Sequence, residues 1–202
     1  MATIETERRV LNGQSELRVK RADDGSATII GHAAVFDSLS EDLGGFRETV
    51  KRGAFRESIA GGADVRALVD HDSSKILGRS SAGTLRVKED RRGLSVEIDV
   101  PDTSVGRDIT TSIERGDVSG MSFQFRTIED KWNTVDGEDR RELVKAELID
   151  VSPVTFPAYS ATDVALRSLQ TYHDKQEADA NNEEYRSGVS VLRRRLDLEE
   201  AG

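Results

Sequence analysis

The sequence predicts a mainly β protein (α+β) with flanking helices, built around a closed or nearly closed β-barrel. Three observations lead to this fold class. At least six short segments in the first 160 residues have the composition or alternation of strands, only two stretches have helical spacing, and turn-forming residues separate the strands. The chain has 202 residues, of which 36% are hydrophobic, and this suits one domain with a single core.

The expected strands are short, and several of them pair as hairpins across turns rich in Asp and Gly. They cover residues 16–21, 27–36, 63–71, 84–88, 94–100, 121–128 and 143–151. The segment 94–100 alternates most regularly between apolar and polar residues. Helices are expected over residues 51–59 and 101–115, with glycines at 61–62 and at 116 to end them. Trp132 is expected in a polar loop between the last two strands.

From Ser168 onward the composition changes. The last 35 residues hold eight acidic and five basic side chains, and their only aromatic residues are two tyrosines. Such a segment has little apolar surface to bury, so it predicts a charged tail that is helical or disordered.

Composition also excludes several classes of function. A formal net charge of −9 argues against a general nucleic-acid binder, which needs a clustered basic face. The absence of cysteine excludes disulfides, thiolate metal sites and a cysteine nucleophile. No apolar run has the length of a signal peptide or a membrane span, so a soluble protein of the cytosolic compartment is expected.

His71 is the first candidate for acid–base chemistry. It is expected at the end of an apolar strand face, flanked by Asp70 and Asp72, so that one side of the imidazole would be dry and the other wet. An imidazole in that position is suited to general-base work. A histidine that only hydrogen-bonds its neighbours is the alternative, and the local sequence alone favours it.

Ser122 is the second candidate. It follows a helix end and a glycine turn, and it alternates with the apolar residues Met121 and Phe123. Its hydroxyl could be presented to a base, with backbone amides nearby to hold an oxyanion. Most serines after a glycine turn make only local hydrogen bonds, and the local pattern is not the G-x-S-x-G elbow of α/β-hydrolases.

Asp150 is the third candidate. It continues the apolar face of Val144, Ala146 and Leu148, and a carboxylate at the end of such a row needs a partner. Glu147 is expected on the other face of the strand, where a solvent-exposed carboxylate is ordinary. The pattern therefore favours Asp150 over Glu147 as a functional acid, with a capped or salt-bridged aspartate as the alternative.

Other polar residues carry weaker signals. Arg79 follows Gly78 and could lie near a developing negative charge, although a surface arginine is the simpler interpretation. His32 lies inside an expected strand and is interpreted as structural, and His173 belongs to the charged tail. The sequence has no phosphate-binding loop, dinucleotide fingerprint or metal-ligand cluster, so no cofactor is expected.

Nine segments of the chain agree, in order, with the motifs of one known family. They are Gly31–Phe36, Gly44–Val50, Gly53–Phe55, Val65–Asp72, Ile76–Arg79, Gly83–Leu85, Gly93–Leu94, Arg115–Phe125 and Asp150–Tyr159. Together they resemble the prohead serine proteases of tailed phages, the proteases of capsid maturation. The match is specific because several long motifs agree.

The resemblance implies a fold like that of the herpesvirus assemblin proteases, a closed β-barrel surrounded by helices, and a serine nucleophile with a histidine base. Carried over to this sequence, Ser122 would be the nucleophile and His71 the base. Asp150, just before a Val-Ser-Pro-Val run, would be the third catalytic member. The herpesvirus relatives use a second histidine there, and neither His32 nor His173 matches such a position.

By this resemblance, the chain would be a serine endopeptidase. It would cleave the scaffold-like segment of the major capsid protein, and itself, inside the phage procapsid in the host cytoplasm. A homodimer or other self-association stays open, and neither nucleic acid nor membrane is an expected partner. The expected organisation is an N-terminal extension over residues 1–14, a protease domain over 15–167 and a charged tail over 168–202. The alternative is a non-catalytic β-barrel scaffold or capsid-assembly module.

Overall fold

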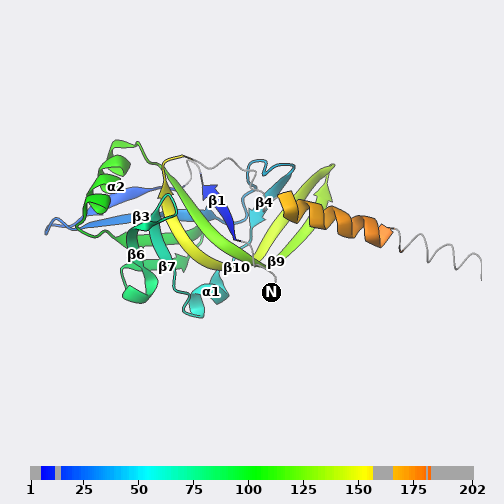
Figure 1. The fold of residues 1–202 in the computed structure, drawn as a ribbon, viewed down its shortest axis with the longest axis horizontal. Coiled ribbons are helices and arrows are strands. Elements are labelled where there is room, and N and C mark those ends of the chain that lie inside the picture. The colour runs from blue at the N-terminus through cyan, green and yellow to red at the C-terminus, as the bar shows by residue number, and fades with distance from the viewer. Residues whose placement is uncertain (1–5, 12–14, 157–165, 181, 183–202) are drawn as a thin grey trace, which may run out of the picture.

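The fold contains two β-sheets (Figure 1). They enclose the larger of two hydrophobic clusters in the described residues. The computed structural model describes residues 6–11, 15–156, 166–180 and 182. The larger sheet contains, in spatial order, β1 (Glu7–Leu11), β9 (Gly120–Val135), β10 (Glu138–Val154), β5 (Arg66–Val69) and β6 (Asp72–Arg79), with β4 (Phe46–Val50) also paired to β10. The smaller sheet contains β2 (Arg18–Arg21), β3 (Ala27–Val35), β8 (Gly93–Asp99) and β7 (Leu85–Glu89). The helical elements are α1 (Arg56–Ala60), the 3-10 turn η1 (Ser80–Ala82), α2 (Ser104–Arg115) and a helix over residues 166–180.

The long hairpin of β9 and β10 is the central element of the larger sheet. Its two strands join at Asp136 and Gly137, whose φ angles of 54° and 79° are both positive. A two-residue turn of this kind matches the right-handed twist of the strands, and Asp-Gly is among its preferred sequences. Trp132 therefore lies within β9, and the polar loop expected around it does not exist.

Strand β10 is long enough to pair with two further strands in succession. Its first part runs parallel to β4, with Leu143 opposite Val50, and its last part runs parallel to β5, with Val151 opposite Ala67. On its other edge it pairs with β9 along its length. The end of β10 therefore lies between β9 and β5. Ser122 lies near the start of β9, and His71 lies two residues beyond the end of β5.

The core is formed by inward-facing residues of both sheets together with apolar side chains of α1 and α2. On β9, Phe123 and Phe125 stack with ring centroids 5.1 Å apart, and Phe55 meets Phe123 edge-on at 5.4 Å. Both arrangements are favoured geometries of aromatic pairs. The odd-numbered residues of this part of β9 are thus committed to the core, so Ser122 lies on the opposite face of the sheet.

Helix α2 lies where the periodicity predicts it. The Thr103 side chain accepts a hydrogen bond from the Gly106 N–H, which caps the helix, and Ile109 and Ile113 are buried. The helix ends at Gly116, whose φ of 83° is the left-handed conformation that glycine adopts at little cost.

The closed barrel expected from the sequence is wrong. Within the described residues no strand pairing connects the larger sheet to the smaller one, and the edges at β6 and β7 stay separate. The edges do approach closely, since a Cβ on Gly78 would lie 2.8 Å from the Thr84 carbonyl oxygen. Alternating inward residues are common to packed sheets and barrels, so the pattern could not distinguish these two architectures.

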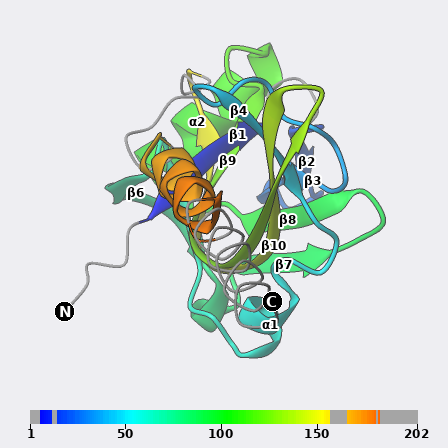
Figure 2. The same cartoon turned by 90° about the vertical axis from the view of Figure 1, so that its right-hand side faces the viewer.

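The helix over residues 166–180 lies beside the far end of the β9–β10 hairpin (Figure 2). The Tyr172 ring stacks on Trp132 with centroids 5.0 Å apart, and His173 Nε2 lies 2.6 Å from an Asp139 carboxylate oxygen. The first part of the expected tail is thus helical and packed, whereas residues 183–202 lie outside the described part of the chain. None of the described helices is long and apolar enough to span a membrane.

Candidate active site

His71 lies in a tight turn between β5 and β6, and the expected strand ends two residues before it. Asp70 and His71 have φ angles of 51° and 58°, so both adopt the left-handed conformation of a two-residue hairpin turn. A non-glycine residue pays about 1 kcal/mol or more for that conformation. The surrounding contacts must therefore hold the turn in place.

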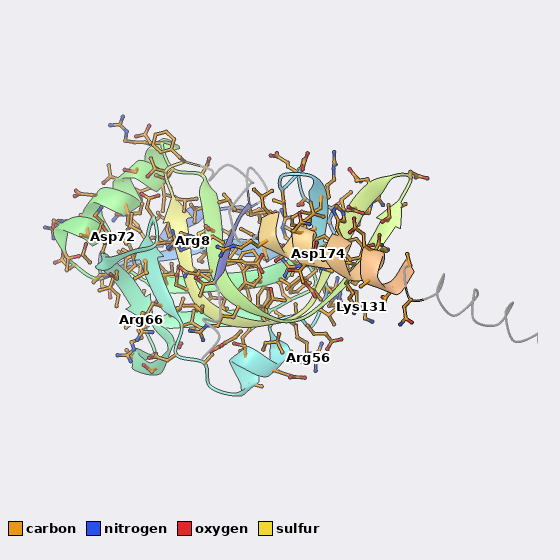
Figure 3. The ribbon with its side chains drawn as sticks, turned by 45° about the vertical axis from the view of Figure 1, so that its right-hand side comes forward. Arg8, Arg56, Arg66, Asp72, Lys131 and Asp174 are labelled. Carbon is orange, nitrogen blue, oxygen red and sulfur yellow. The ribbon has the colours of Figure 1, made fainter. Side chains whose placement is uncertain are left out.

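The end of β10 supplies these contacts. The Asp70 carboxylate accepts hydrogen bonds from the Thr155 N–H and hydroxyl, both at 2.8 Å, and the Asp70 N–H donates to the Pro153 carbonyl at 3.1 Å. The His71 N–H donates to Ser152 Oγ at 3.2 Å. Both residues of the turn are thereby fixed to β10, and the imidazole is aimed at the face of the sheet that carries Ser122. Figure 3 labels Asp72, the next residue after His71, and Arg66 at the start of β5.

Asp150 reaches the same face because β10 contains an irregularity. Leu148 lies opposite Phe125 of the core face, but Asp150 lies opposite Gln124, so an extra residue separates the two pairs. A β-bulge of this kind turns the following side chain to the other face of the sheet. Asp150 is therefore buried, as its apolar row predicted, but it lies on the face of Ser122 and not on the core face.

The three candidate side chains form one continuous row. His71 Nε2 lies 2.6 Å from Ser122 Oγ, and His71 Nδ1 lies 2.5 Å from Asp150 Oδ1. An ionised carboxylate can only accept, so Nδ1–H donates to Asp150 and leaves Nε2 of the neutral ring as an acceptor for the Ser122 hydroxyl. Ser122 is 0% exposed, and the His71 and Asp150 side chains are 6% and 5% exposed.

Ser152 is a fourth polar residue of the site, and the sequence analysis assigned it no role. It lies directly opposite Ser122 on β10, and its hydroxyl donates to Asp150 Oδ1 at 3.1 Å. Its oxygen also accepts the His71 N–H described above. The hairpin register alone could not have found it, because an unbroken register from the turn at residues 136–137 would place Val151 opposite Ser122. The irregularity between Leu148 and Asp150 brings Ser152 there instead.

The other sequence candidates lie elsewhere. Glu147 forms an ion pair with Arg126 at 2.9 Å on the outer part of the hairpin. Arg79 pairs with Asp64 in an exposed position. His32 and His173 each contact a different aspartate and not the site. In the described residues no group of three or more His, Cys, Asp or Glu side chains is arranged to hold a metal ion.

Strand β1 borders the site, and four charged residues on β1, β4 and β10 are buried together, with the partly exposed Asp130 beside them. In this buried charge cluster Arg9 contacts Glu48 and Glu7, at 2.9 and 2.7 Å. Arg141 contacts Glu7, Glu48 and Asp130, at 2.7, 3.1 and 2.7 Å. Burial alone would raise the pKa of Glu7, but the hydrogen bond from Arg141 and the charges of Arg9 and Arg141 lower it to about 2.

The row of serine hydroxyl, imidazole and carboxylate is the arrangement that defines serine hydrolases of the Ser–His–acid class. The comparisons with known proteins agree with this class. The family model of the Caudovirus prohead serine protease matches residues 15–176, and the chain belongs to this family. It is therefore a serine protease of the tailed-phage prohead type, as the sequence motifs predicted.

A solved structure is also similar to this chain. It is that of the capsid assembly protease of bacteriophage T4, with 10% sequence identity and a TM-score of 0.45, and the match covers 73% of this chain and 98% of the other. Among curated proteins, none matches the sequence significantly.

Proposed function

We propose that Ser122, His71 and Asp150 are the catalytic residues of this capsid maturation protease. The row of hydrogen bonds from Ser122 Oγ through the imidazole to Asp150, with distances of 2.6 and 2.5 Å, carries the proposal. Burial supports it as well, because charges that develop in a site of low dielectric constant interact more strongly than charges in water.

The proposed reaction is acyl transfer. His71 Nε2 takes the proton of the Ser122 hydroxyl while Oγ forms a bond to the carbonyl carbon of the scissile peptide. The C–N bond then breaks, and the imidazolium gives its proton to the leaving amine. Water attacks the acyl-enzyme by the same route and releases the acid. Asp150 keeps Nδ1 protonated and stabilises the imidazolium, and backbone amides near the glycine turn before Ser122 are proposed to hold the oxyanion.

Two observations favour Asp150 over Glu147 as the acid. Asp150 contacts the imidazole and is buried, whereas Glu147 is about half exposed and paired with Arg126. Asp150 also accepts the Ser152 hydroxyl, which leaves the carboxylate less freedom to rotate away from His71. A positioned carboxylate of this kind fixes both the tautomer and the orientation of the imidazole.

The proposed substrates are the scaffold-like segment of the major capsid protein and the protease itself, inside the procapsid. Membership in the prohead family supports this proposal. Enclosure in a shell would raise the effective concentration of protease and substrate, so that a modest intrinsic activity is sufficient.

Co-expression with the capsid protein, followed by mass analysis of the capsid protein's N-terminus, tests the proposal. Ser122→Ala and His71→Ala should each abolish trimming, which corresponds to a loss of about 10⁴-fold or more in kcat. Ser119→Ala, which alters an exposed serine three residues away, is the matched control and should trim normally.

The assignment of the acid has its own matched pair. Asp150→Asn should reduce kcat on the order of 10⁴-fold, because the amide no longer fixes the productive tautomer. Glu147→Gln should leave kcat within a few fold of the parent. Equal effects of the two substitutions would refute Asp150 as the third member. Normal trimming by the Ser122 and His71 variants would support a non-catalytic capsid-assembly module instead.

A further inference from the structure

Strand β1 lies directly against the Ser122 hydroxyl. It pairs antiparallel with β9, with Val10 opposite Ser122 and Arg9 opposite Phe123. The Ser122 hydroxyl lies 2.9 Å from the Arg9 carbonyl oxygen, within hydrogen-bond distance. Ser122 is 0% exposed, so no external peptide carbonyl can reach it while β1 keeps this position.

The contact with Arg9 also competes with the base. A serine hydroxyl has one hydrogen, so Ser122 can donate either to His71 Nε2 or to the Arg9 carbonyl, and both acceptors lie within reach at 2.6 and 2.9 Å. When the Arg9 carbonyl takes this hydrogen bond, His71 cannot take the proton. The Arg9 carbonyl thus favours a resting arrangement of the nucleophile.

The geometry of β1 is that of a bound peptide. Extended peptides commonly bind by adding a strand to a sheet edge, where main-chain hydrogen bonds hold them. Strand β1 pairs with five residues of β9 at the edge of the larger sheet and brings a carbonyl group to the serine. We propose that β1 occupies the substrate's place on β9, and that an extended peptide segment binds by displacing it. This inference rests on the proposed role of Ser122 as nucleophile.

The buried charge cluster allows β1 to leave without creating an unpaired buried charge. Strand β1 contributes one cation and one anion, Arg9 and Glu7, which already contact each other at 2.7 Å. After its departure Arg141 still has Glu48 and Asp130 as partners, at 3.1 and 2.7 Å. The net charge of the cluster is the same with and without β1. An unpaired buried charge, which would oppose such a displacement strongly, is therefore not created.

The expected occupant is an unfolded or extended segment and not a compact domain. It has to offer about five consecutive residues in strand conformation to replace the pairing from Glu7 to Leu11. A folded loop cannot present such a stretch without first unfolding, so the exchange would select for exposed, flexible parts of a partner.

A reversible crosslink tests whether β1 must move. Arg8 and Gln124 are opposite each other, their side chains are in contact at 3.2 Å, and the chain has no native cysteine. An Arg8→Cys/Gln124→Cys variant can therefore be oxidised with diamide to lock β1 onto β9, and a thiol reductant releases it. Figure 3 labels Arg8, which is exposed.

The readout is the rate of labelling by a fluorophosphonate. In this reaction a P–O bond forms to Ser122 Oγ, fluoride leaves, and His71 takes the serine proton. The oxidised variant should label at least ten-fold more slowly than its reduced form. A Lys20→Cys/Thr28→Cys variant, which crosslinks β2 to β3 in the other sheet, should label equally in both forms.

The outcomes separate this inference from the proposed function. Equal labelling of the oxidised and reduced Arg8/Gln124 variant would overturn the displacement of β1 and leave Ser122 as nucleophile. No labelling of the parent chain, or labelling that survives Ser122→Ala, would overturn both proposals. A Glu7→Gln/Arg9→Gln variant gives a second test, because weaker anchoring of β1 should speed labelling several-fold. An unchanged rate in a folded protein would contradict the inference.

Discussion

The carboxylate of Glu7 makes the attachment of β1 dependent on pH. Its pKa is lowered from 4.5 to about 2 in the folded protein. Because the folded pKa lies below the unfolded one, the stabilisation is complete above about pH 5 and is lost as the pH falls toward 2. A shift of this size corresponds to about 3 kcal/mol in the free energy of unfolding, of which about 2 kcal/mol is lost between pH 7 and pH 3.

A Glu7→Gln variant removes this dependence while keeping the shape of the side chain. Urea unfolding of both proteins at pH 7 and pH 3, followed by the fluorescence of the single tryptophan, measures it. The loss of unfolding free energy on acidification should be about 2 kcal/mol smaller in the variant than in the parent. Trp132 is a suitable probe because its ring lies 5.7 Å from the Arg141 guanidinium of the cluster.

A matched control distinguishes the cluster from general acid sensitivity. Glu57 is exposed on α1, so Glu57→Gln should lose as much stability between pH 7 and pH 3 as the parent does. If Glu7→Gln and the parent show the same loss, the ion pairs of Glu7 do not stabilise the fold and the reasoning about the cluster is refuted.

Three further predictions concern other parts of the molecule. Ser152→Ala removes a hydrogen bond to the ionised Asp150, so it should lower kcat about 10- to 100-fold and change KM little. Steady-state kinetics on a peptide substrate measures both constants, and an unchanged kcat would argue against a positioning role for Ser152. Gly93→Ala should cost about 3 kcal/mol in urea unfolding, because its Cβ would lie 1.9 Å from a β3 carbonyl oxygen. Trp132→Ala should raise hydrogen exchange in residues 166–180 by removing the ring stacked on Tyr172, and unaltered exchange would show that the stack does not hold the helix.

Much of the smaller sheet could be predicted from the sequence. The hairpins β2–β3 and β7–β8 and the helix α2 are confirmed, because each has regular spacing between clear turn or cap residues. Strand β1 was missed because it has the sequence Glu-Arg-Arg-Val-Leu, whose buried positions are charged. Those positions are satisfied by Glu48 and Arg141, which lie far away in the sequence, so no local pattern could reveal them.

The site was predicted in part. The motifs brought Ser122, His71 and Asp150 together as candidates, and the three side chains do lie in contact, while their catalytic roles stay a prediction. Strict alternation along the strand predicted that Asp150 faces the core. The bulge before Asp150 turns it to the other face, and a bulge leaves no local signature in the sequence. It also placed His71 within a strand, although the residue lies in a left-handed turn that contacts with distant residues hold in place.

The end of β10 and the residue that follows it, residues 150–155, supply almost every contact that holds the site together. Asp150 contacts the imidazole, Ser152 contacts both Asp150 and His71, and Thr155 fixes the turn through Asp70. Under the catalytic roles proposed for Ser122, His71 and Asp150, local fraying of this strand end would remove activity, and such fraying needs far less free energy than global unfolding. By the same proposal, a partner that binds only the ordered strand end would shift this equilibrium toward the active arrangement.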